Sequence, residues 1–140
     1  MTMKVSASVV ALVSILLMLV PLAARADEFI VGDDQHWRFG LNYTAWAYEY
    51  TFVWNDTLVF KYDPPNGTNI PHNVVLFNNI HDYDACNINK STLLANVTQG
   101  AGEGFRIRLL NLTPYYFACG IHEGFHCRNG TMKFTVITLD

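Results

Sequence analysis

The stretch GFRIRLL, residues 104–110, has the clearest strand pattern in the chain. Its apolar residues Phe105, Ile107 and Leu109 alternate with two arginines. Alternation with a period of two places the apolar and the charged side chains on opposite faces of a strand. A strand with one apolar face needs a second layer to cover that face. This stretch therefore indicates β-sheets that pack on a shared core.

The rest of the chain repeats this pattern in short stretches, separated by turn sequences such as PPNG and QGAG. Helical periodicity is nearly absent, and only residues 81–90 fit a short helical segment, with Asp82 as its cap. About seven short strands at this spacing predict an all-β Greek-key sandwich. The other strand candidates are residues 29–31, a stretch within 43–51, 57–62, 73–77, 115–119 and 132–139.

Aromatic residues make up 14% of the chain, enough to build much of a core from rings. Trp37, Trp46 and Trp54 are predicted to lie in that core, because large aromatic side chains stabilise mainly through burial. His36 and His81 are predicted to lie on the surface.

The first 26 residues have the organisation of a secretory signal peptide. The apolar run at residues 9–20 is too short for a comfortable membrane span, and ARA at residues 24–26 gives the small-x-small pattern that signal peptidase recognises. We predict residues 1–26 as a signal peptide cleaved after Ala26. Residues 27–140 are then one small domain.

Net charge limits the partners of this domain. Seven of the nine basic residues and all 12 acidic residues follow Ala26, which leaves about five net negative charges. A negative domain fits neither nucleic acid nor an anionic membrane. The C-terminal TMKFTVITLD indicates a last strand without a lipid anchor. We therefore expect a secreted, extracellular monomer without stable membrane insertion.

Secretion changes the meaning of two further features, because glycosylation and disulfide formation both need the secretory pathway. The three cysteines are Cys86, Cys119 and Cys127, and an odd count predicts one disulfide and one remaining thiol. Dense Asn-x-Ser/Thr triplets indicate a glycoprotein in which part of the sites is modified. The triplets begin at Asn42, Asn55, Asn66, Asn89, Asn96, Asn111 and Asn129.

The stretch YYFACGIHEGFHCRNGTMKF, residues 115–134, gathers two cysteines, two histidines and a methionine. A thiolate, two imidazoles and a weak axial thioether are the ligands of an electron-transfer copper site. Cys119, at the end of an apolar strand, would supply the thiolate, and Met132 the thioether. One imidazole must come from a distant segment, and IPHNVVLF offers His72. Asn73 could hydrogen-bond to the loop that carries the cysteine.

With these residues the chain resembles the phytocyanins, plant blue copper proteins that include plantacyanins, stellacyanins and uclacyanins. The resemblance covers nearly the whole predicted domain, through FIVGDDQHW, FVWNDTLVFKY, PHNVV, YDAC, YYFACG, HC and GTMKF. It implies a cupredoxin-like sandwich with one type 1 copper, which cycles between Cu(I) and Cu(II) in electron transfer. It also implies a place in the cell wall or apoplast. The redox partner, a small-molecule reductant or a protein, is left unknown.

The resemblance further implies a disulfide and a ligand set. The family pairs the cysteine after the second histidine with one in the short helical segment, here Cys127 with Cys86. That pairing leaves one thiol for copper. The implied copper ligands are His72, Cys119, His126 and Met132.

The loop spacing departs from the family pattern, in which the second histidine usually follows the ligand cysteine by five residues and the methionine follows that histidine by five. His126 follows Cys119 by seven residues, and Met132 follows His126 by six. His122, three residues after Cys119 as in plastocyanins, is therefore an alternative ligand. The carbonyl or hydroxyl of Thr131 is an alternative but poorer axial donor. His126 is favoured because it keeps the His-Cys dipeptide that joins the ligand to the disulfide.

Three other functions are alternatives to electron transfer by copper. A closed zinc site of Cys119, His122, His126 and Cys127 would leave an unpaired cysteine in a secreted protein. A cysteine nucleophile would need an activating partner, and none stands out, so we do not expect an enzyme. Early nodulin-like proteins keep the sandwich, lose the copper ligands, and are regarded as structural or signalling proteins of the cell surface. A copper-free role of that kind is the alternative to electron transfer.

Overall fold

A computed structural model describes residue 2 and residues 25–140 of the chain. The predicted signal peptide, residues 1–26, therefore lies almost entirely outside the described residues. Among the helices that are described, none has the length and apolar character needed to cross a membrane.

Nine strands within residues 25–140 form two main sheets and one short pair. One sheet has the order β1-β3-β6, the second has the order β5-β4-β7-β8, and β2 pairs with β9. β1 runs parallel to β3, and the four-stranded sheet is antiparallel throughout. The strands are β1 (Glu28–Ile30), β2 (Phe52–Val53), β3 (Thr57–Phe60), β4 (Val74–Phe77), β5 (Ser91–Ala95), β6 (Phe105–Arg108), β7 (Tyr115–Ala118), β8 (Lys133–Val136) and β9 (Thr138–Leu139).

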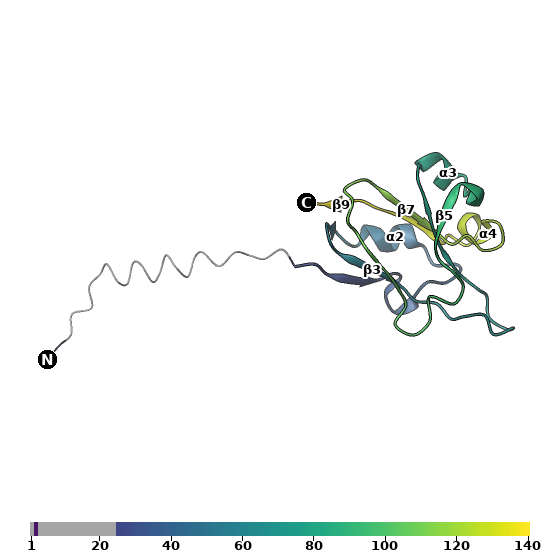
Figure 1. Ribbon diagram of the computed structural model, residues 1–140, viewed down its shortest axis with the longest axis horizontal. Helices are drawn as coiled ribbons and strands as arrows, with labels where there is room; N and C mark the ends of the chain where they lie inside the picture. The colour runs from purple at the N-terminus through teal and green to yellow at the C-terminus, as the bar shows by residue number, and fades with distance from the viewer. Residues whose placement is uncertain (1, 3–24) are drawn as a thin grey trace.

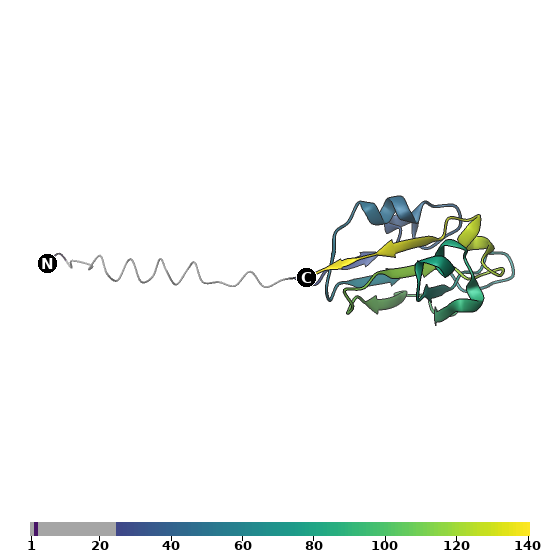
Figure 2. The same ribbon diagram turned by 90° about the horizontal axis from the view of Figure 1, so that it is seen from above.

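Large rings fill the space between the two main sheets, which Figure 2 shows as stacked layers. Phe60 of β3 packs on Phe117 of β7 with ring centroids 5.5 Å apart, and Trp37 stands edge-on to Phe60 at 5.2 Å. All three side chains are almost fully buried. On β6 the predicted alternation is confirmed: Phe105, Ile107 and Leu109 are half-buried or buried, and the two arginines are exposed. The predicted all-β sandwich is therefore confirmed.

One predicted strand is instead a helix, α2 (Tyr43–Tyr48). Asn42 begins this helix, because its side-chain Oδ1 accepts a hydrogen bond from Ala45 N at 3.0 Å. Tyr43 and Trp46, three residues apart, form its buried face, and the helix packs against β8. The strand prediction for this stretch was wrong because aromatic residues suit either element, and the cap and the spacing of three decided for the helix.

The helical segment predicted at residues 81–90 is divided into α3 (Ile80–Asp84) and a 3-10 turn (Ile88–Lys90). Asn79 rather than Asp82 is the N-cap, since its Oδ1 accepts from Asp82 N at 2.9 Å. The helix ends before Cys86, whose φ of 48° is incompatible with helix continuation.

Other predictions of exposure have mixed outcomes. His36 and His81 are exposed, and Trp37 and Trp46 are buried, as predicted. Trp54 was wrongly predicted to lie in the core: it is 51% exposed in the turn after β2, where its indole N–H donates to Leu110 O.

Two short strands, β2 and β5, were not predicted, and residues 132–139 form two strands, β8 and β9, rather than one.

The two ends of the sandwich carry different features (Figure 1). α3 and the one-turn helix α4 (Phe125–Arg128) lie together at one end. β9 and the C-terminus lie at the other end.

Candidate metal centre

Two strand ends bring His72 and Cys119 together. β4 pairs with β7 in antiparallel register, with Val75 opposite Ala118. His72 lies just before β4 and Cys119 directly follows β7. Because the two strands are antiparallel neighbours, the two residues meet at the same end of the sheet. His72 Nδ1 lies 3.8 Å from Cys119 Sγ. Residues fixed by paired strands are held in place before any metal binds.

His126 completes the cluster from α4. Its Nδ1 lies 3.4 Å from Cys119 Sγ and 3.2 Å from His72 Nδ1. A first-row metal at about 2.0–2.3 Å from nitrogen and sulfur, with angles between tetrahedral and trigonal, separates its donors by about 3.3–3.8 Å. The three separations in this cluster cover nearly that range. Among the described residues, these three are the group of histidine, cysteine and acidic side chains close enough to hold a metal.

The three side chains of the cluster are buried, and the thiol is protonated at neutral pH. His72 is 7% exposed, His126 2% and Cys119 0%. Burial raises the pKa of the Cys119 thiol to about 11, partly opposed by backbone hydrogen bonds from Asn73 and Ile121. This shift is opposite to the one that activates a cysteine nucleophile, which needs a thiolate near neutral pH. A soft sulfur with two imidazoles is instead the donor set that suits copper.

Asn73 ties the two halves of the site together, as the sequence predicted. Its Oδ1 accepts a hydrogen bond from Gly120 N at 2.6 Å, directly after Cys119. Its carbonyl accepts from the indole N–H of Trp37 at 2.9 Å. The loop with the thiol is thereby joined to the segment with His72 and to the core.

The long loop between Cys119 and His126 is accommodated by a left-handed turn. His122, Glu123 and Gly124 have φ values of 53°, 52° and 87°, and Phe125 N donates to His122 O at 3.0 Å. The turn leads into α4 and directs His126 into the cluster.

His122, the alternative ligand, lies outside the cluster. It is exposed, and its ring stands edge-on to the ring of His126 with centroids 5.4 Å apart. The structure therefore brings His126, and not His122, to Cys119.

Met132, the predicted thioether ligand, is fully buried in the same apolar cluster as Cys119. Its carbonyl accepts from Cys119 N at 2.9 Å, and its own N–H donates to His126 O at 3.1 Å. Its backbone thus connects the thiol and the second imidazole. Thr131, the alternative donor, is engaged elsewhere: its hydroxyl donates to Leu41 O and its carbonyl accepts from Lys133 N.

The disulfide joins Cys86 to Cys127, so Cys119 is the one free thiol. The disulfide links the segment after α3 to α4, and its Cys127 is the residue directly after His126. Because Cys127 is oxidised, it cannot ligate a metal, and the zinc site with two thiolates is excluded.

Two aromatic residues that the sequence did not indicate shield the site. Phe39 stands edge-on to the His126 ring at 5.2 Å, and it stacks on Phe125 at 5.9 Å. Gly130 makes room for this packing, since a Cβ there would lie 2.5 Å from the Phe39 ring. The only sequence signal was the Asn-Gly dipeptide, which indicates a turn and not a contact.

The predicted glycosylation asparagines are exposed at six of seven positions, and Asn55 is half-buried. Their modification stays a prediction. Asn129 follows α4 directly, so a glycan there would stand close to the cluster.

Comparisons with known proteins agree with this geometry. Residues 37–131 match the plastocyanin-like domain family. Blue copper protein 1a of Medicago truncatula is 31% identical over 134 residues, covering 96% of this chain and 75% of that protein. Early nodulin-like protein 17 of Arabidopsis thaliana is 31% identical over 129 residues, covering 91% and 67%. The structure of cucumber stellacyanin with Cu2+ gives a TM-score of 0.64 at 28% identity, covering 82% of this chain and 96% of that one.

Proposed function

Since this chain belongs to the phytocyanins, a group of plastocyanin-like domains, we propose that it is a secreted blue copper protein that transfers single electrons outside the cell. The observation that carries the proposal is the buried cluster of Cys119 with His72 and His126. One soft donor and two imidazoles fit copper in both oxidation states. Met132 is the axial ligand in this proposal.

The protein contributes rigidity and a dry environment. Copper, when bound, supplies the one-electron chemistry. Asn73 holds the thiol-bearing loop through Gly120, and the disulfide at Cys127 anchors the helix that presents His126. Ligands held in this way change position little when the oxidation state changes, which keeps electron transfer fast. Phe39 and the surrounding apolar core limit water and help to set the potential.

Two histidines connect the site to the surface. The exposed ring of His122 contacts His126, and we propose this pair as one route for an electron. His72 borders an open pocket of about 370 Å³, whose lining includes Arg38, Lys61 and Asp63. A small reductant could approach the site there.

The first experiment is the visible and electron paramagnetic resonance spectrum of the secreted protein with one equivalent of Cu(II). We expect an intense blue band from the thiolate–copper bond, and we expect Cys119→Ser to abolish it. His126→Ala should remove the band and His122→Ala should leave it nearly unchanged. His81→Ala, at an exposed histidine away from the cluster, is the matched control.

The alternative is a copper-free surface protein, which the early nodulin-like relatives make specific. A colourless protein with an intact Cys86–Cys127 disulfide and a cooperative unfolding transition would favour that alternative and end the electron-transfer proposal. A band that survives His126→Ala but not His122→Ala would keep copper and reassign the ligand.

A further inference from the structure

Asp56, in the turn between β2 and β3, carries a buried carboxylate that is only 1% exposed. Its Oδ2 accepts a hydrogen bond from Val53 N at 2.9 Å, and its Oδ1 accepts one from Asp27 N at 2.8 Å. Neither of the salt bridges found among the described residues involves Asp56. Because a buried carboxylate without a cation is costly, this position favours a positive charge.

Asp27 N belongs to the peptide bond that the sequence predicts to be cleaved. Hydrolysis of the Ala26–Asp27 bond consumes one water, which leaves a carboxylate on Ala26 and an amine on Asp27. The amine takes up a proton near neutral pH, since α-amino groups have pKa values of about 7.7–8.0. The nitrogen that now donates to Asp56 as a neutral amide would then be a cation.

Strand pairing fixes the position of Asp27. Thr57 N donates to Asp27 O at 2.9 Å, and Glu28 pairs with Thr57 in the register of β1 with β3. Each residue along a strand advances by about 3.3 Å, so a terminus one residue away would lie beyond hydrogen-bond distance of Asp56. Among neighbouring cleavage sites, only the one before Asp27 puts the terminal nitrogen on the carboxylate.

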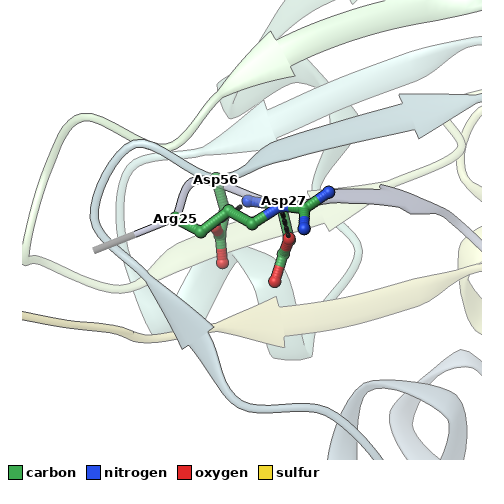
Figure 3. Close-up of polar contacts among 3 residues, drawn as sticks. All are labelled: Arg25, Asp27 and Asp56. Atoms are coloured by element: carbon green, nitrogen blue, oxygen red, sulfur yellow. Dashed lines mark hydrogen bonds and ion pairs between the residues drawn. The ribbon is translucent and has the colours of Figure 1, made fainter. Parts of the chain in front are cut away.

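The residues before Asp27 make only surface contacts in the described part of the chain. Arg25 Nε lies 3.6 Å from Asp27 Oδ1, and the two side chains are 90% and 59% exposed. Figure 3 shows this outer pair beside the inner contact between Asp27 N and Asp56. Exposed ion pairs contribute little stability, so the loss of this Arg25 contact on cleavage costs the domain little.

We propose that the mature chain begins at Asp27 and that its α-ammonium group forms a partly buried ion pair with the buried carboxylate of Asp56. Asp56 thus serves as the binding site for the N-terminus that cleavage creates. Charge-assisted hydrogen bonds are roughly twice as strong as neutral ones, so processing stabilises the fold. Asp56 lies directly before β3, beside the start of β1. The start of β1 and α4 lie at opposite ends of the molecule (Figure 1), and the pairing needs no copper.

The test begins with the full-length chain, secreted from plant cells, whose N-terminus is determined by mass spectrometry. We expect Asp27 as the first residue. A second chain carries one alanine inserted between Ala26 and Asp27, which leaves Asp56 intact but turns Asp27 N into a neutral amide. Mass spectrometry also verifies that this second chain begins at the inserted alanine. Asp56→Asn is the third chain, and Asp27→Asn, which changes only the exposed side chain, is the control.

Thermal unfolding of the metal-free proteins from pH 6 to pH 10 then gives the answer. At pH 6 we expect the unmodified protein and the Asp27→Asn control to melt several degrees above the other two. An ion pair raises the pKa of the α-amino group, so its contribution is fully present below about pH 7.7 and is lost as pH rises through the raised value. Other charged groups near this strand end are Glu28, Arg106, Arg108 and the C-terminal Asp140, and all four chains share them.

Two results would overturn the proposal: a mature N-terminus other than Asp27, or an inserted-alanine chain that melts with the unmodified protein at pH 6. If Asp56→Asn is not secreted, the inserted-alanine chain decides alone. None of these readouts depends on copper, so they are separate from the test of the proposed function.

Discussion

At the scale of single residues, protons and metal compete for the three donor atoms of the cluster. Burial, followed by the charge of His126, lowers the pKa of His72 to about 4. Burial, followed by the charge of His122, also lowers the pKa of His126. The pKa of Cys119 is raised to about 11. At pH 7 both imidazoles are therefore neutral and ready to bind, and only the thiol carries a proton that a metal must displace.

This arrangement predicts how copper affinity depends on pH. Metal binding should release one proton at pH 7, so the apparent affinity should rise about tenfold per pH unit around neutrality. The dependence should become steeper at acidic pH, as His126 takes up a proton below its ordinary pKa and His72 takes up one near pH 4. Competition with a chelator of known pH dependence measures the slope. A slope of two at pH 7 would mean that an imidazole is protonated there, and a slope of zero would exclude displacement of the thiol proton.

At the scale of elements, the loop from β7 to β8 decides the site. Its left-handed turn, the α4 helix and the disulfide together present His126 from a segment two residues longer than the family pattern. Gly130 closes the loop: its carbonyl accepts from Gly40 N at 2.9 Å, and Phe39 packs where a side chain at position 130 would lie. The packing of this loop is therefore coupled to the ligand.

Gly130→Ala should disturb the metal site as well as the fold. The added Cβ would lie 2.5 Å from the Phe39 ring and 2.6 Å from His126 O, so both must move. Overpacking of this kind costs about 1–3 kcal/mol of unfolding free energy, and we also expect a shifted blue band. Urea unfolding and the visible spectrum measure the two effects.

The matched control is Gly67→Ala, where φ is +85° and no heavy atom lies within 4 Å of the added Cβ. It should cost some stability through its backbone alone and leave the band unchanged. Equal spectra for both variants would show that Phe39 and the His126 carbonyl do not influence the site.

At the scale of the whole molecule, the net charge of the domain and the local charge around His72 have opposite signs. The mature domain would carry about five net negative charges, yet the pocket that borders His72 includes Arg38 and Lys61 beside one carboxylate, Asp63. The net negative charge of the domain then repels an anionic reductant at long range, whereas Arg38 and Lys61 attract it at short range.

Arg38→Glu should slow reduction by an anionic reductant severalfold at low salt. The effect should disappear at high ionic strength, because exposed charges are screened beyond about 10 Å at 0.1 M salt. Reduction by a neutral phenol should not change. Arg108→Glu makes the same change in net charge on β6, outside the pocket, and stopped-flow rates that respond equally to both variants would assign the effect to net charge alone.

Secondary structure was predictable where the side-chain pattern was unambiguous. The alternation around Ile107 gave β6, and apolar runs gave β3, β4 and β7 to within one or two residues. The stretch that became α2 was missed because a cap at Asn42 outweighed its aromatic composition. β5 was missed because it lies at a sheet edge with Leu93 57% exposed, so no apolar alternation marks it.

The sequence by itself determined the chemistry: an odd number of cysteines, a histidine before an apolar strand, and the pattern that relates them to blue copper proteins. These features depend on residue identity and spacing along the chain. Only the tertiary structure decided that His126 rather than His122 faces Cys119 and that Phe39 packs on the His126 ring. It also decided that the buried carboxylate of Asp56 lies beside the backbone nitrogen of Asp27. Each of these is a contact between segments far apart or a direction of a side chain, which backbone turns and sheet register fix and local sequence does not encode.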